Sequence, residues 1–92
     1  MELRWLRRAR RDLESISAFI ARDDPKAARE LLLALREKVQ RLSEFPYSGR
    51  ASEQADVREL VVHERYLVSY RIRMDRIEIL QVWHARQDRS PH

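Results

Sequence analysis

The sequence predicts an α+β domain in the element order β-α-α-β-β-β, and two observations carry this prediction. Apolar residues recur every three or four positions through residues 9–42, which is the period of amphipathic helices. From residue 57 the period changes to two, which is typical of strands with one buried face. Neither layer can bury its apolar face alone. We therefore expect an antiparallel helical hairpin packed on a C-terminal three-stranded antiparallel sheet, with an N-terminal edge strand.

The N-terminal segment, residues 2–6, is short and alternates in polarity. Leu3 and Trp5 flank the charged Arg4, as in a strand with one buried face. We expect this segment to form an edge strand.

The first helix is predicted over residues 9–22, where the apolar stripe consists of Leu13, Ile16, Phe19 and Ile20. An Asp23-Asp24-Pro25 sequence then interrupts the pattern. Aspartate is a favoured N-cap, and proline fits the first helical position because its missing N–H is not needed there. A second helix therefore begins at Pro25, and the short connection predicts a helical hairpin.

The second helix carries its apolar stripe at helical spacing and ends before Phe45-Pro46, because proline disfavours helix at the preceding residue. The stripe is Ala28, Leu31, Leu32, Leu35, Val39 and Leu42. Residues 45–50 form a turn that contains the only glycine, and residues 50–56 are expected to be a polar surface loop.

Three strands follow, over residues 57–62, 66–72 and 77–87. In the second strand, two sets of residues alternate: one is Tyr66, Val68, Tyr70 and Ile72, and the other is Leu67, Ser69, Arg71 and Arg73. The connections at residues 63–65 and 74–76 are short enough for tight antiparallel hairpins.

Composition limits the possible functions. The 92 residues are expected to form one domain, residues 1–92, with 19 basic and 15 acidic side chains and a net charge of +4. That balance favours an acidic partner, either nucleic acid or protein. There is no cysteine, no phosphate-binding glycine loop and no paired-histidine spacing, so we expect neither a metal nor a cofactor. No signal-peptide run is present at the N-terminus, and a cytoplasmic protein without a membrane partner is the simplest interpretation.

An ordered set of segments carries a family resemblance: Asp12–Ile16, Phe19–Ala21, Asp24–Ala28, Leu42–Arg50, Val57–Leu60, Tyr66–Ile72 and Ile79–Gln87. Together they resemble the RelE/ParE-type toxin superfamily of bacterial toxin–antitoxin modules, and the ParE branch most closely. The resemblance covers nearly the whole chain. It implies the toxin component of a type II toxin–antitoxin system, associated with plasmid stabilisation and growth arrest, and held in a hetero-oligomer by a cognate antitoxin.

The resemblance leaves three functions open. The ParE class blocks DNA gyrase and has no established hydrolytic step, whereas the RelE class cleaves messenger RNA on the ribosome. A non-toxic module that only binds an antitoxin is the third. The ribonuclease members resemble one another in carrying an arginine early in the middle C-terminal strand, where this chain has Leu67. They also tend to carry a lysine-rich or acidic patch in the loop before the sheet, whereas residues 51–56 of this chain include no basic residue. Both departures favour a gyrase inhibitor that is not an enzyme.

A ribonuclease would need a general acid and base together with cations aimed at the phosphate. The candidates for that alternative are Arg58, His84 and Arg86. Histidine can exchange protons near neutral pH, but a histidine near arginines is also common on basic surfaces. We therefore expect no catalytic residue in the gyrase-inhibitor interpretation.

The residues expected to bind partners share a position on the last three strands or at their end. They are Arg58, Tyr66, Arg71, Arg73, Trp83, His84, Arg86 and Gln87. Simpler roles compete with binding: the two aromatic residues suit packing on a sheet. The two central arginines can pair with Glu59 or Glu78 on neighbouring strands.

We expect the antitoxin to bind a sheet edge by strand addition, or the groove of the helical hairpin by an amphipathic helix. The strand near Leu3 and the strand that ends at Trp83 are the candidate edges. A cluster of five arginines, Arg4, Arg7, Arg8, Arg10 and Arg11, precedes or opens the first helix. Positive charge there opposes the helix dipole, so the cluster is either solvated or faces a partner.

Overall fold

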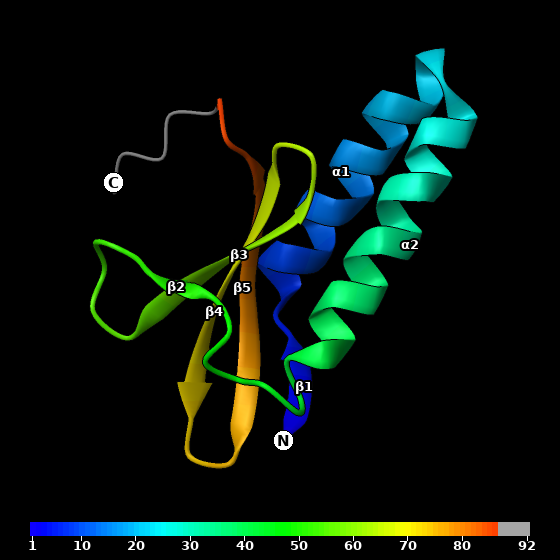
Figure 1. Cartoon of the computed structure of the whole chain (residues 1–92). Helices are drawn as coiled ribbons and strands as arrows, with labels where there is room; N and C mark the ends of the chain where they lie inside the picture. Colours follow the sequence, from blue (N-terminus) through cyan, green and yellow to red (C-terminus); the bar gives the residue numbers. More distant parts are fainter. Residues whose placement is uncertain (87–92) are drawn as a thin grey trace.

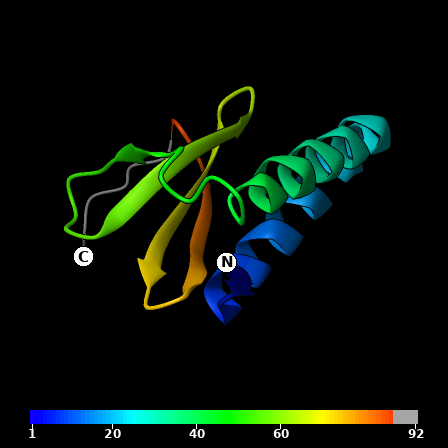
Figure 2. The ribbon, with the colours of Figure 1, turned by 60° about the horizontal axis from the view of Figure 1, so that its bottom comes forward.

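The computed structural model describes residues 1–86, which form one sheet with a helical hairpin on one of its faces (Figures 1 and 2). In chain order the elements are β1 (Glu2–Trp5), α1 (Arg7–Asp23), α2 (Pro25–Arg41), β2 (Arg50–Ala51), β3 (Val57–His63), β4 (Tyr66–Arg73) and β5 (Arg76–His84). The predicted α+β class and the order of helices and main strands are confirmed. None of the helices formed by residues 1–86 is long and apolar enough to cross a membrane.

The sheet has five strands in the order β1-β5-β4-β3-β2. As predicted, β3, β4 and β5 pair in antiparallel fashion. Two additions make the sheet larger and mixed. The edge strand β1 pairs with β5 in parallel, and the two-residue β2 pairs with β3 inside the segment expected to be a loop.

The hairpin forms where the sequence places it. The backbone N–H of Ala27 donates to Asp24 Oδ1 at 3.1 Å, and Pro25 occupies the first helical position. This cap satisfies one of the free N–H groups that begin a helix. The two helices then run side by side in opposite directions, and their far end extends beyond the sheet (Figure 1).

The core lies between the hairpin and the face of the sheet that we call the helix face. Three residues of the stripe predicted for the second helix belong to it, Leu35, Val39 and Leu42, and the sheet adds Val62, Val68, Tyr70, Ile77, Ile79 and Val82. Ala28 and Leu31 of the same stripe are also buried, whereas Leu32 is only partly buried. One expectation for the first stripe is wrong: Phe19 is 68% exposed. Phe19 belongs to the last part of α1, and that end of the hairpin extends past the sheet (Figure 1).

A β-bulge in β5 decides which side chains lie on each face. Ile79 pairs with Tyr70 and Gln81 pairs with Ser69, so Leu80 is an extra residue without a partner on β4. One extra residue reverses the alternation of every side chain that follows it. His84 therefore lies on the helix face, and Trp83 lies on the opposite face, which we call the open face.

Candidate functional site

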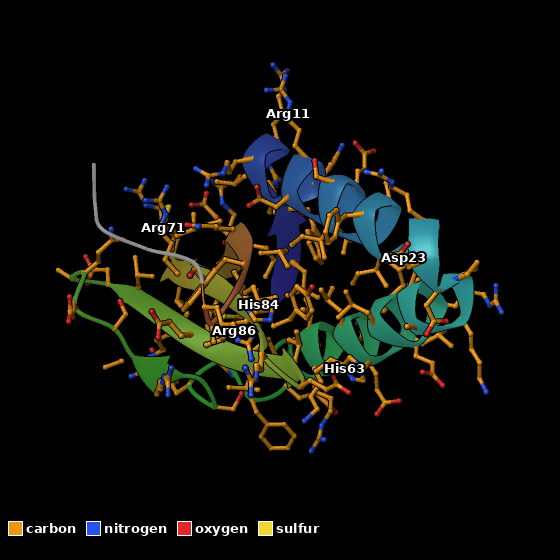
Figure 3. All side chains as sticks on the ribbon, turned by 90° about the horizontal axis from the view of Figure 1, so that it is seen from above. Arg11, Asp23, His63, Arg71, His84 and Arg86 are labelled. Carbon is orange, nitrogen blue, oxygen red and sulfur yellow. The ribbon has the colours of Figure 1, made fainter. Side chains whose placement is uncertain are left out.

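The residues expected to bind partners divide between the two faces of the sheet. Arg58 pairs in register with Tyr70, and His84 pairs with Tyr66, so all four belong to the helix face. In contrast, Arg71, Arg73 and Trp83 belong to the open face, as paired residues share a face with their partners. The view from above shows Arg71 well away from His84 and Arg86 (Figure 3).

His84 ends β5 and is partly buried. Its ring meets the ring of Tyr66 edge to face, with centroids 4.9 Å apart, and its Nδ1 accepts a hydrogen bond from the backbone N–H of Arg86 at 3.0 Å. Tyr66 itself packs against the core. These contacts fix the orientation of the imidazole and support the simpler packing role for Tyr66.

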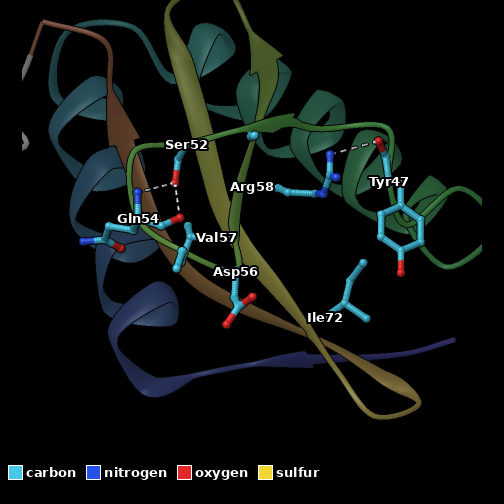
Figure 4. A pocket seen from close by; sticks show the side chains of 9 residues that line it. Tyr47, Ser52, Gln54, Asp56, Val57, Arg58 and Ile72 are labelled. Carbon is cyan, nitrogen blue, oxygen red and sulfur yellow. Dashed lines mark hydrogen bonds between the residues drawn. The ribbon is translucent and has the colours of Figure 1, made fainter.

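Arg58 holds the turn that connects α2 to the sheet. Its guanidinium donates to the carbonyl of Gly49 at 2.6 Å. It also donates to the carbonyl of Tyr47 at 3.4 Å (Figure 4) and lies 5.1 Å from the centre of the Tyr47 ring. Arg58 and Tyr47 also line an open pocket of about 440 Å³ beside the β2–β3 turn. The cation is thus used within the chain, on two carbonyls and an aromatic ring.

Arg58 and His84 do not converge. Their register partners, Tyr70 and Tyr66, are four residues apart on β4, which corresponds to ~13 Å at the usual rise of a strand. General acid–base chemistry requires groups within hydrogen-bonding reach of one reacting atom. The arrangement of these side chains does not meet that requirement.

The open face carries a cluster of arginines around one carboxylate. Arg71 Nε donates to Glu78 Oε1 at 2.7 Å, and Arg76 donates to Glu78 Oε2 at 3.0 Å, while the carboxylate is only 6% exposed. The hydrogen bond from Arg71 is the main cause that lowers the pKa of Glu78, and Arg76 adds to it against the opposing effect of burial. The sequence suggested Glu59 or Glu78 as the partner of Arg71, and the structure shows Glu78.

Trp83 is a packing residue on the same face. It is buried, its Nε1 donates to Ser69 Oγ at 2.9 Å, and its register partner is the buried Leu67. Leu67, at which the resemblance to the ribonuclease branch would place an arginine, is therefore paired in register with Trp83. Gln87, the last of the residues expected to bind partners, lies outside the described residues.

Two side chains that join distant elements were not singled out in the sequence. Asp12 of α1 accepts the backbone N–H of Val82 at 3.0 Å through Oδ2 and pairs with Arg8 at 3.2 Å through Oδ1. The hydroxyl of Tyr70, on β4, forms hydrogen bonds with Pro46 and Gly49 in the turn after α2. Both contacts depend on tertiary placement, so spacing along the chain gives no signal for them.

The arginines at the start of α1 have few partners. Arg8 pairs with Asp12, and Arg4 pairs with Glu2 at 3.3 Å. The helix begins without a side-chain cap and without an acidic residue in its first turn. Arg11 projects away from the helix into solvent (Figure 3). Among residues 1–86, no three acidic or histidine side chains are arranged to hold a metal ion.

Two grooves lie beside edges of the sheet. One, of about 210 Å³, lies between β1 and the helices and is lined chiefly by apolar residues, together with Arg36 and Gln40. The other, of about 270 Å³, lies between α2 and β3. The strand that ends at Trp83 is not an edge in its first half, where β1 covers it, and Asp12 occupies the N–H of Val82 beyond that point.

The sequence matches the family described as the ParE toxin of the type II toxin–antitoxin system parDE, over residues 3–89. The chain belongs to this family. The predicted membership of the RelE/ParE toxin superfamily is thereby confirmed, and the chain is a toxin of the type II class.

Relatives support the same family. The chain is 43% identical over 86 residues to a protein of Sinorhizobium fredii described as a toxin, Y4kP, and covers 88% of it. It is 35% identical over 81 residues to toxin RelE2 of Caulobacter vibrioides, with 88% of this chain and 91% of that protein aligned. A solved structure, described as a chromosomal ParDE TA system from P. aeruginosa, matches with a TM-score of 0.81, 27% identity and coverage of 91% and 95%.

Proposed function

We propose that this toxin acts in the cytoplasm by binding and inhibiting DNA gyrase, without a hydrolytic step, and that a cognate antitoxin neutralises it. The observation that carries the proposal is the separation of the candidate catalytic groups. Arg58 is bound to turn carbonyls, and His84 lies two strands across the sheet from it and ~13 Å farther along the strand direction. Binding, unlike catalysis, does not require these groups to meet.

The pairing of arginines with Glu78 on the open face also favours a binding function over a catalytic one. Cleavage of RNA requires cations that are free to approach the developing charge on a phosphate. Here Arg71 and Arg76 are held by Glu78, whose carboxylate remains ionised because its pKa is lowered. The carboxylate offsets part of the positive charge that these two arginines could offer to a phosphate.

The test is a pair of assays with the same purified toxin. We expect it to inhibit DNA supercoiling by purified gyrase in a concentration-dependent manner. We also expect primer extension on transcripts, after the toxin is induced, to show no new cuts within codons. Full gyrase activity at saturating toxin, together with codon-positioned cuts, would replace this proposal with the ribonuclease.

The ribosome-dependent ribonuclease remains the second candidate, and one observation favours it. A relative at 35% identity carries the name RelE2, and that alignment spans most of both chains. In that function, Arg86, which is exposed at the end of β5, and His84 beside it would have to act together with Arg58. The primer-extension arm of the test decides between the two candidates.

Growth arrest decides the third candidate, the non-toxic module. We expect expression of the chain alone to halt growth and co-expression of the neighbouring antitoxin gene to restore it. Normal growth at a verified level of soluble toxin would leave only antitoxin binding as the function. Co-purification with the antitoxin as a hetero-oligomer is expected in either case.

A further inference from the structure

The turn that joins β4 to β5, residues 73–76, holds an apolar side chain in open solvent. Met74 is 95% exposed, more than any other large apolar residue described in the structure. Exposure of one apolar side chain is ordinary on a protein surface, but the backbone of this one is not. Its φ is 54°, in the left-handed region that bulky side chains rarely adopt.

Two other residues that are not glycine have a positive φ within residues 1–86, and both suit their positions better. They are Asp56, at 66°, and Glu64, at 49°. Aspartate tolerates this region because its short polar side chain can bond the local backbone. Glu64 lies in an exposed turn, where water solvates its carboxylate. In contrast, a tight hairpin turn favours glycine or asparagine over Met74, and the solvent favours a polar side chain.

The arginines that flank the turn add a third unfavourable feature. Arg73 and Arg76 lie directly opposite each other on β4 and β5, where like charges repel. Arg76 donates to Glu78 at 3.0 Å, which compensates its charge. Arg73 is exposed and forms no ion pair within residues 1–86. Features that oppose local stability and gather in one turn are typical of a site that serves binding rather than the fold.

We propose that the β4–β5 turn contacts gyrase: Met74 enters an apolar pocket of gyrase, and Arg73 pairs with a carboxylate at the rim of that pocket. The inference rests on the proposed inhibition of gyrase and names the part of this chain that binds it. Protein interfaces are commonly built in this way, with an anchor side chain buried in a pocket and polar groups around it. Binding removes the thioether from water, which the fold of the free toxin does not do.

The charge of the turn favours a protein over a nucleic acid as the partner. Three arginines lie in or beside the turn, Arg71, Arg73 and Arg76, together with two carboxylates, Asp75 and Glu78. Two of the arginines are bound to Glu78. Affinity for a phosphate backbone depends on several cations that replace counterions. The turn offers one cation outside an ion pair among the described residues, and one cation beside an apolar anchor fits a single carboxylate at the rim of a protein pocket.

The turn is also separate from the two grooves beside the edges of the sheet. None of residues 73–76 lines either groove. We therefore expect changes in the turn to affect inhibition of gyrase without affecting the affinity for the antitoxin.

Met74→Gly separates binding from folding. Glycine adopts a positive φ without steric cost, so the Tm of the variant should be at least that of the wild type. Its inhibition of supercoiling by purified gyrase should weaken roughly 10-fold or more, because burial of a methionine side chain contributes at least that much to binding. The control, Glu64→Gly, makes the same backbone change in the turn at the other end of β4 (Figure 1). It should change the inhibitory concentration by less than about threefold.

Two further substitutions keep the backbone constraint and change only the chemistry of the side chain. Met74→Leu preserves an apolar side chain and should inhibit within about threefold of the wild type. Met74→Gln has a similar length but is polar, and should weaken inhibition roughly 10-fold.

Charge reversal tests the second contact. Arg73→Glu should weaken inhibition of gyrase, and the effect should shrink as salt rises. The control, Arg29→Glu, makes the same charge change at an exposed position of α2 and should leave inhibition within about threefold.

The outcomes separate this inference from the function on which it rests. Inhibition by the wild type that is weakened in Met74→Gly and Met74→Gln beyond the Glu64→Gly control, with antitoxin affinity unchanged, supports the proposal. Full inhibition by both Met74 variants overturns it and leaves inhibition of gyrase intact. Met74 variants that inhibit fully but lose affinity for the antitoxin, or for a short DNA duplex without gyrase, also overturn it. No inhibition by the wild type overturns both the proposed function and this inference.

Discussion

The side chain of Tyr70 joins the sheet to the turn after α2, and removing its hydroxyl is the sharpest test of the fold. The hydroxyl donates to the carbonyl of Pro46 at 2.8 Å and accepts the N–H of Gly49 at 2.9 Å. In Tyr70→Phe, the buried N–H of Gly49 loses its partner, and Pro46 loses a donor at a partly buried site. One unsatisfied buried group costs about 1–3 kcal/mol, so we expect that loss in the free energy of unfolding.

Thermal and urea unfolding of the purified toxin measure this loss. In a domain of this size, each kcal/mol corresponds to ~4–8 °C in Tm. The control is Tyr47→Phe, which makes the same chemical change on a ring that is 66% exposed. It should change stability by no more than about 0.5 kcal/mol. Equal stability of the Tyr70→Phe variant and the control would refute the role assigned to the hydroxyl.

Alkaline pH gives a second measurement on the same variant. Burial raises the pKa of Tyr70 above its ordinary value of 10.0. Above that pH the unfolded chain releases the proton while the folded chain keeps it, so the stability of the wild type falls as pH rises. Tyr70→Phe should lack this part of the fall. An identical alkaline slope in the two proteins would contradict the burial of a protonated hydroxyl.

Three further predictions follow from other contacts. Asp12→Ala leaves the N–H of Val82 without its partner and should cost about 1–3 kcal/mol in urea unfolding, whereas Asp12→Asn, which keeps an acceptor oxygen, should cost clearly less. The hydrogen bond from Arg71 lowers the pKa of Glu78 below its ordinary value of 4.5. The ionised carboxylate therefore contributes its full stabilisation of the fold above that value, and this contribution is lost as pH falls through the lower folded-state pKa. In acid unfolding, Glu78→Gln should accordingly lose less stability than the wild type. His84→Ala should leave growth arrest intact, and loss of arrest in a folded variant would favour the ribonuclease.

Periodicity was sufficient to predict the elements that bury a continuous apolar stripe. The hairpin follows from the stripe of α2 and from the cap at Asp24, both of which are local. The pairing of β1 with β5 could not be predicted from local patterns in the sequence, because it joins residues more than 70 positions apart. The two-residue β2 is a strand only through its pairing with β3, and its own residues, Arg50 and Ala51, carry no strand pattern.

The candidate site was harder to predict because a single unpaired residue separates its members. Before Leu80, odd-numbered residues of β5 face the helices, and after it even-numbered residues do. The apolar run through Ile79, Leu80 and Val82 is the only trace of this change in the sequence, and such a run is equally consistent with a strand buried on both faces. Sequence alone therefore grouped Trp83 and His84 as one end of a strand.

The bulge has a functional consequence for the end of β5. It turns the indole of Trp83 toward Ser69 on the open face and the imidazole of His84 toward Tyr66 on the helix face. Adjacent side chains on opposite faces cannot act on one bond, whereas they can stabilise one strand from both sides. On the side away from β4, this strand is covered by β1 over Arg76–Ile79 and bonded by Asp12 at the N–H of Val82.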